Sequence, residues 1–409
     1  MKKLIALLFL CSSYCFAQTP QTVTGRRLSL VVDSTKGYKL IQVPGAPIGT
    51  LQLSKELMDN ILKKHVQVPP ARKRIGFQLV VDQDAFVSSF NEDRDYTMGL
   101  QLTLAGERKN YKFVRWLFSL KDDDLNTKNW TATFSFSGFT PYHLEYNYVD
   151  RSDRPYAALS SISSSGMYSF REEDLTTTIK RRQFFRSSSL FGFMGKGTSQ
   201  KAKFIQTAIH SGQRALASDP NDARPNPLGW EYAIASTSNF AAVVNYSADY
   251  ANEFQYTIFS GTKAFAPFKL MVKPGVGFAA GTLYNNLNAG VQAQLGFFST
   301  SIFNGNNEGA IFDLIENPGW FELSLTGEFF GQAWAHNSTL NGILFNRSRD
   351  IYHMEYNQIE KFTNYYTYGM ELSYKRKISL GYSKVVRSNV VKDLQREQVF
   401  GRFVLRIGI

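Results

Sequence analysis

Two acids and a threonine lie where two predicted β-strands meet the loop between them, and their oxygen atoms could bind a metal ion. In the stretch VVDQDAFVSSFNEDRDYTMGLQLTL (80–104), Asp82 and Asp84 end the first strand and Thr97 begins the second. Hard oxygen ligands suit calcium, although two carboxylates and one hydroxyl fall short of the roughly six to eight oxygens that calcium takes. The same acids would also fit as rim carboxylates or turn caps.

A histidine in a long connection is the second candidate group, because an imidazole can take a proton from water near neutral pH. The segment SQKAKFIQTAIHSGQRAL (199–216) predicts a helix that carries His210. We expect the packing contacts of this helix to come from its apolar residues Phe204, Ile205, Ala208, Ile209 and Leu216. A lone loop histidine is more often structural or solvated than catalytic, and the chain has four others: His65, His143, His336 and His353.

Other catalytic patterns are not evident in the sequence. It shows no G-x-S-x-G nucleophile elbow, no P-loop and no zinc-ligand spacing. The serine-rich run Ser160–Ser165 has the period of a strand and lacks a partner base. A serine nucleophile of the familiar pattern is therefore not indicated.

Short amphipathic strands must position these groups. In Tyr96–Leu104 the apolar side chains alternate with small and polar ones, and the chain ends on another such strand, Arg402–Ile409. Segments of about ten residues with aromatic ends are typical of tilted strands that cross a bilayer, and a terminal strand suits barrel closure. We predict an all-β fold, a transmembrane antiparallel β-barrel of about twelve strands, over an exported soluble β-module that binds glycan. The other predicted strands are Gly76–Asp82, Asn129–Phe139, Tyr156–Phe170, Phe184–Gly195, Trp230–Tyr246, Lys269–Leu283, Ala289–Phe298, Trp320–Phe329, Tyr366–Tyr374 and Ile378–Val386.

The lengths of the connections orient the predicted barrel. Bacterial barrels have an even number of strands, short periplasmic turns and long external loops. With twelve strands, the turn 375–377 is periplasmic and the connection 196–228 is external, which brings Asp84, Thr97 and His210 to the external rim. The strand-like segment Glu253–Phe265 would make the count odd, so we doubt that it is an independent strand. We expect Lys180–Arg182 in a periplasmic turn, as an interfacial anchor.

The N-terminus indicates export to the cell envelope. Residues 1–17 have the positive start, apolar centre and small final residue of a signal peptide, with cleavage expected after Ala17. We assign residues 18–75 to an N-terminal periplasmic extension and residues 76–409 to the barrel. The net charge is +12, and removal of Lys2 and Lys3 with the signal peptide lowers it to +10. A basic exported chain suggests an anionic partner such as a phosphorylated lipid surface, although on charge alone surface lysines that keep the chain soluble are the better explanation. We expect no nucleic-acid binding.

Five motifs, in order, resemble those of the outer-membrane lipid A deacylases. DQDAF (82–86) and DRDYTMGL (93–100) are similar to the paired N-terminal motifs of that family. The others are Phe139-Thr140-Pro141, Asp153-Arg154-Pro155-Tyr156-Ala157, and Gln206 with His210 followed by Gly229-Trp230. The resemblance covers residues 76–409.

The resemblance implies a twelve-stranded outer-membrane barrel that removes an acyloxyacyl chain from lipid A of lipopolysaccharide. It implies that His210 deprotonates water, that Gln83, Asp84 and Thr97 belong to the catalytic site, and that Asp84 and Thr97 bind a calcium ion. The sequence departs from the family pattern at Gln83, where the family has asparagine, and at Ala158, where it has glycine. The alternative is a non-enzymatic barrel of the same fold, acting as a channel or a surface-binding protein.

Overall fold

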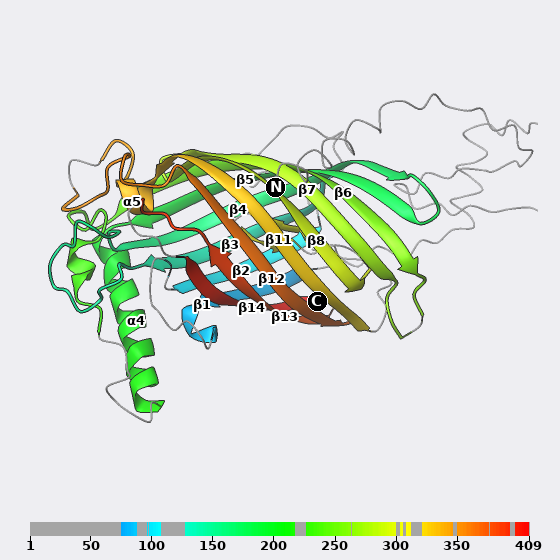
Figure 1. Cartoon of the computed structure of the whole chain (residues 1–409), viewed down its shortest axis with the longest axis horizontal. Helices are drawn as coiled ribbons and strands as arrows, with labels where there is room; N and C mark the ends of the chain where they lie inside the picture. Colours follow the sequence, from blue (N-terminus) through cyan, green and yellow to red (C-terminus); the bar gives the residue numbers. More distant parts are fainter. Residues whose placement is uncertain are drawn as a thin grey trace, which may run out of the picture. The chain divides into compact units, whose positions relative to one another are not determined.

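The computed structural model describes a β-barrel with one long helix at one end (Figure 1). It describes residues 75–87, 96, 98–107, 127–216, 226–262, 264–299, 303–305, 308–311, 321–346, 350–375, 377–392 and 397–408. The predicted signal peptide, most of the predicted extension and Thr97 lie outside the described residues. None of the described helices is long and apolar enough to cross a membrane.

Twelve antiparallel strands form one closed barrel, in which β1 pairs with β2 on one side and with β14 on the other. This confirms the predicted barrel, the strand number and the role of the last strand in closure. The strands are β1 (Ile75–Gln83), β2 (Met98–Glu107), β3 (Thr127–Phe139), β4 (Ala157–Asp174), β5 (Ile179–Met194), β6 (Ala241–Phe259), β7 (Phe268–Gly281), β8 (Tyr284–Phe297), β11 (Phe321–Asn337), β12 (Phe362–Tyr374), β13 (Ile378–Arg387) and β14 (Gln398–Gly408).

Shorter elements lie in the connections between these strands. A separate two-stranded sheet, β9 (Phe303–Gly305) with β10 (Glu308–Ile311), lies between β8 and β11. The helical segments are η3 (Asp84–Phe86), α4 (Lys196–Leu216), η5 (Gly229–Tyr232) and α5 (Ser338–Asn341). All four lie at the same end of the barrel, which we call the α4 end.

The alternating pattern places apolar side chains outside the barrel and polar ones inside. On β2, Leu102 and Leu104 are exposed on the outer surface, whereas Gln101 and Thr103 are buried in the lumen. Successive side chains of a strand point to opposite faces, so this division follows directly from the sequence period. The exposed apolar surface of the strands is the surface that a bilayer covers.

Of two predictions about the segment around β6, one is confirmed and one is wrong. Residues 253–259 continue β6, so Glu253–Phe265 is not an independent strand, as the parity of the strand count indicated. The predicted strand at Trp230 is wrong over its first part, because Trp230 lies in η5 and β6 begins at Ala241.

Charged side chains pair inside the lumen. Arg182 and Glu253, which are both buried, form an ion pair of 3.5 Å, and Arg406 contacts Glu371 at 2.5 Å. The prediction that Lys180–Arg182 forms an interfacial turn is wrong, because β5 already begins at Ile179 and its inward side chains include Arg182. β5 therefore begins at Ile179, before the predicted start at Phe184.

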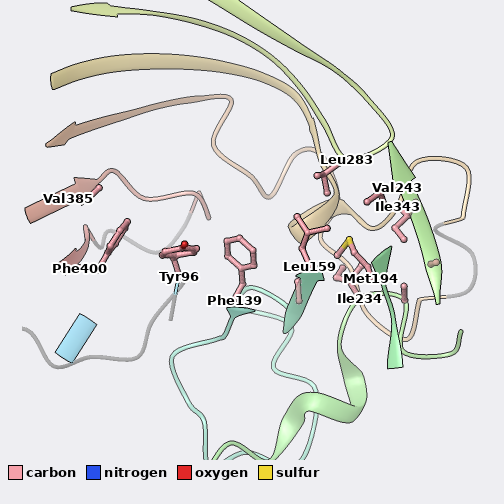
Figure 2. Packing of buried hydrophobic residues seen from close by; sticks show 13 residues of the cluster. Tyr96, Phe139, Leu159, Met194, Ile234, Val243, Leu283, Ile343, Val385 and Phe400 are labelled. Carbon is pink, nitrogen blue, oxygen red and sulfur yellow. The ribbon is translucent and has the colours of Figure 1, made fainter. Parts of the chain in front are cut away.

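An apolar layer lines the inside of the α4 end (Figure 2). Tyr96 packs between Phe139 and Phe400, with ring centroids 5.4 Å and 4.9 Å away. The layer continues along inward positions of β4, β5 and β6 through Leu159, Met194 and Val243. It also includes residues of the connections at this end, such as Ile234 and Ile343.

A glycine turn connects β5 to α4. Gly195 has φ +118°, a conformation that glycine adopts without the steric cost of a Cβ. The backbone N–H groups of Lys196 and Gly197 donate to Ser238 O (2.9 Å) and Asn239 O (3.1 Å), which fixes the start of the helix. From there α4 runs across the direction of the strands and contacts β5, β4 and β3 (Figure 1).

We expect Leu325→Arg on β11 to lower the free energy of unfolding. Leu325 is 62% exposed on the outer wall, and a cation at the bilayer midplane costs about 2–4 kcal/mol, falling to about 0–1 near the interfaces. Denaturant unfolding in lipid vesicles measures the change. Ile351→Arg, at an exposed position in the connection after β11, is the matched control. Equal stability of the two variants would contradict a lipid-facing position for Leu325.

Candidate active site

A covered apolar patch lies on the outer wall of the barrel at the α4 end. Met98 of β2, Phe136 of β3 and Ala158 of β4 continue the outward rows that hold the exposed side chains of Leu100 and Phe134. Unlike those two residues, the three are buried. They pack with Leu144, Tyr156, Ala202, Trp230 and Ala233, which come from the connections and from α4. The helix therefore packs on the outside of the barrel wall.

The face of α4 that packs against this patch is largely polar. Ala202, Gln206 and His210 follow one another at intervals of four residues, the spacing of one helix face, and each is at most 1% exposed. The prediction that the apolar residues of α4 make its packing contacts is wrong for Phe204 and Ile205, which are 75% and 37% exposed. His210 is thus enclosed between α4 and neighbouring elements rather than solvated.

A chain of contacts holds this helix face in place. The indole Nε1–H of Trp230 donates to Gln206 Oε1 at 2.9 Å, and the Trp230 ring packs on Tyr156 with centroids 4.8 Å apart. A Cβ at Gly229 would lie 2.5 Å from Tyr156, so only glycine allows this approach. Two of the five motifs singled out in the sequence therefore meet here, and His210 lies two helical turns beyond Ala202, about 12 Å along the axis.

Asp84 and Gln83 lie at the same end of the barrel. Asp84 begins η3 directly after β1 and is 3% exposed, and its Oδ1 accepts a hydrogen bond of 2.9 Å from Gln83 Nε2. Gln83 is the strand partner of Met98, which belongs to the covered patch. The patch therefore connects the β1 rim, with Gln83, to the buried face of α4. Thr97 lies outside the described residues, so its predicted role is not tested.

Asp82 has a structural role that the sequence did not indicate. Its carboxylate accepts hydrogen bonds of 2.7 Å and 2.8 Å from Arg402, on the neighbouring strand β14, and one of 3.0 Å from the Tyr96 hydroxyl. Arg402 is its register partner across the β1–β14 seam. Of the two acids in this motif, Asp82 is thus committed to barrel closure. Burial and the adjacent carboxylate raise the pKa of Tyr96 well above its usual value, which keeps its hydroxyl protonated as a donor.

Another motif secures the connections above the patch. Asp153 Oδ2 accepts from the backbone N–H of Tyr142 at 2.7 Å, and Asp153 O accepts from the Tyr352 hydroxyl at 2.7 Å. Burial, with a smaller contribution from Asp153, raises the pKa of Tyr352 to about 12, so the hydroxyl remains a donor. Arg154 lies over the Phe139 ring at 4.7 Å. These contacts fix the geometry of two connections and do not supply a reactive group.

The oxygen atoms near η3 fit calcium in type but not in number. Calcium takes about six to eight oxygen ligands. The Asp84 carboxylate and the Gln83 amide are of that type, but within the described part of the chain no three His, Cys, Asp or Glu side chains converge as a metal site. Thr97 and the remaining residues of the β1–β2 connection lie outside this part. Calcium binding by Asp84 and Thr97 therefore stays a prediction.

Comparison with known proteins places the chain in a family. The sequence profile described as "Outer membrane protein LpxR" matches residues 61–409. The chain belongs to the LpxR family. It shares the fold of LpxR from Salmonella typhimurium, with a TM-score of 0.54 and 14% identity over 81% of this chain and 99% of that one. The translocator domain of autotransporter NalP from Neisseria meningitidis gives a TM-score of 0.34 and 8% identity over 82% of this chain and 86% of that one. No curated protein sequence matches the chain.

This LpxR-family barrel also has a cavity of about 150 Å³ in its lumen. Its lining includes Tyr96, Arg154, Arg387 and Arg402, and it belongs to the inner surface of the wall. In the part of the chain that the structure describes, neither Asp84 nor His210 lines this cavity. The candidate active site on the outer wall is thus distinct from this lumen cavity.

Proposed function

We propose that this LpxR-family barrel is an outer-membrane esterase that removes an acyloxyacyl chain from lipid A, with His210 as the general base and calcium as the cofactor. The position of His210 carries the proposal. It is buried on the face of α4 that packs on the outer wall, where a substrate that diffuses in the membrane can approach from the side. An acyl chain bound there would replace water around the reacting ester.

The chemistry requires one base and one site for negative charge. His210 takes a proton from water, the resulting hydroxide oxygen attacks the ester carbonyl carbon, and a tetrahedral oxyanion forms. Collapse of that intermediate breaks the ester bond to the sugar oxygen, which receives the proton from His210 and becomes a hydroxyl, and the acyloxyacyl chain leaves as a carboxylic acid. A calcium ion held with Asp84 and Thr97 would stabilise the negative charge on the carbonyl oxygen. Gln83 orients Asp84 through the 2.9 Å hydrogen bond.

A non-enzymatic channel is the second candidate, and the buried side chains that narrow the lumen argue against it. Lys273 and the pair of Arg182 with Glu253 are buried inside the described strands, and the apolar layer narrows the α4 end. Gly229, Trp230 and Gln206, in contrast, hold the buried face of α4 at the outer-wall site. A channel would not need a buried histidine on the outer wall.

We expect calcium removal to stop deacylation in isolated outer membranes. Mass spectrometry of lipid A before and after incubation would show the loss of one acyloxyacyl unit by the wild-type chain. A calcium-specific chelator is expected to abolish that loss, and added calcium, but not magnesium, to restore it. Outer membranes without the protein are the control. Unchanged lipid A in calcium-supplied membranes that hold the folded barrel would contradict the proposed function.

A further inference from the structure

The face of α4 that points away from the barrel carries an apolar stripe. Phe204 is 75% exposed, and Ala208 and Ala215 are also exposed. At 3.6 residues per turn, these three lie on the side of the helix opposite to Ala202 and His210. Ile205, at the edge of the stripe, is 37% exposed. A large exposed phenylalanine in the centre of a helix face indicates a surface that something apolar covers.

The stripe continues onto the outer wall of the barrel. A Cβ at Gly197, which lies on the same side of α4 as Phe204, would be 3.0 Å from Phe240. The Phe240 ring, 65% exposed, packs edge-on against Phe193 of β5, with centroids 6.0 Å apart. Phe193 in turn packs on Phe191, with centroids 4.9 Å apart, and both are exposed on the barrel's outer surface. The apolar surface of the barrel thus extends without interruption to the start of the stripe.

Basic side chains border the stripe on both sides. The helical repeat places Lys201 on one side and Lys196 and Arg214 on the other, all exposed, with Lys203 further round. The helix contains no aspartate or glutamate. Long basic side chains can lay their methylenes along an apolar surface and present their charges to phosphates. This combination matches an anionic lipid surface.

We propose that α4 is an interfacial helix that docks on the anionic leaflet beside the barrel. Phe204 and Phe240 enter the boundary between headgroups and acyl chains, and the basic side chains contact the lipid phosphates. The helix runs across the strand direction in Figure 1, so it lies along the membrane rather than through it. The proposal needs only the outer-membrane barrel and does not depend on deacylase activity.

Spin labels on single cysteines can test this docking in the full chain. Both native cysteines, Cys11 and Cys15, fall within the predicted signal peptide, so the exported chain has no competing thiol. Phe204→Cys and Ala208→Cys place a nitroxide on the stripe. Phe193→Cys is the lipid-facing reference, and Glu355→Cys, whose side chain is 69% exposed, is the aqueous reference. Each labelled barrel is inserted into vesicles of phosphatidylglycerol and phosphatidylcholine.

The readout is the ratio of nitroxide accessibility to oxygen and to a water-soluble nickel chelate. We expect ratios at 204 and 208 severalfold above the ratio at 355 and close to that at 193. The ratios should fall in vesicles of phosphatidylcholine alone and in a variant with Lys201→Gln and Lys203→Gln. Ratios at 204 and 208 equal to the ratio at 355 would overturn the proposal. Ratios that are the same with and without phosphatidylglycerol would also overturn it.

A second copy of the chain is the other possible cover for the stripe. Spin–spin broadening at position 204 that disappears on dilution with unlabelled chain would show such a dimer and overturn lipid docking. Labels at two stripe positions keep the test valid if one substitution disturbs α4. Labelled Phe193→Cys confirms insertion of the barrel in each preparation.

Discussion

His210→Ala is expected to remove lipid A deacylation while leaving the barrel folded. A positioned general base contributes about 10²–10⁴-fold to the rate of a hydrolysis. Because His210 is 1% exposed on the side of α4 that packs on the wall, no bulk buffer base can take its place at the ester. The measurement is a time course of lipid A mass spectra from membranes with matched amounts of protein.

His143→Ala is the matched control. His143 lies at the same end of the barrel, but its side chain is 37% exposed and contacts Glu145 at 3.0 Å on the surface. We expect this variant to deacylate like the wild type. A fold test accompanies both variants, because loss of a buried side chain can loosen α4: hydrogen exchange of residues 198–210 should stay protected. Deacylation by a folded His210→Ala chain at the wild-type rate would exclude His210 as the base.

The barrel could be predicted from the sequence because its signal is local. Alternation such as that of Leu102 and Thr103 fixes which side faces lipid, whatever the rest of the chain does. The ends of the strands could not be predicted. β6 runs for 19 residues through a stretch where the pattern weakens, because its backbone hydrogen bonds to β5 and β7 extend the strand.

The sequence predicted at which rim of the barrel the candidate site lies, but not its position on the wall. Strand parity placed Asp84 and His210 at one end, but it does not distinguish the inner from the outer side of the wall. The helix was also predicted, yet its packed face was not, because the usual rule that apolar faces pack inward fails when lipid covers the outer face. Nothing local distinguishes Asp82 from Asp84 either, since the partner of Asp82 is Arg402, 320 residues away.

Arg402→Ala is expected to destabilise the barrel strongly at its closing seam. The substitution removes two hydrogen bonds and the compensating charge from Asp82, whose carboxylate is 1% exposed. Removing one partner of a buried ion pair costs about 3–5 kcal/mol, because the other charge stays buried. Arg402→Lys keeps the charge but loses the bidentate geometry, so an intermediate loss is expected. Denaturant unfolding in lipid vesicles, followed by tyrosine and tryptophan fluorescence, gives the free energies.

The double variant Asp82→Ala with Arg402→Ala shows whether the loss of stability comes from the broken ion pair or from the lost side-chain volume. Because no unpaired charge remains, we expect it to be more stable than Arg402→Ala alone. Losses that simply add would show that the ion pair itself contributes little. Asp84→Asn, two residues along the chain, is the control for local disturbance: we expect the stability of the seam to be kept, since Asp84 lies in η3 beyond the β1–β14 ladder. Asp82 is held by Arg402 in the seam, whereas Asp84 is proposed to act at the outer-wall site. Substitution of Asp82 is therefore expected to change unfolding, and substitution of Asp84 to change deacylation.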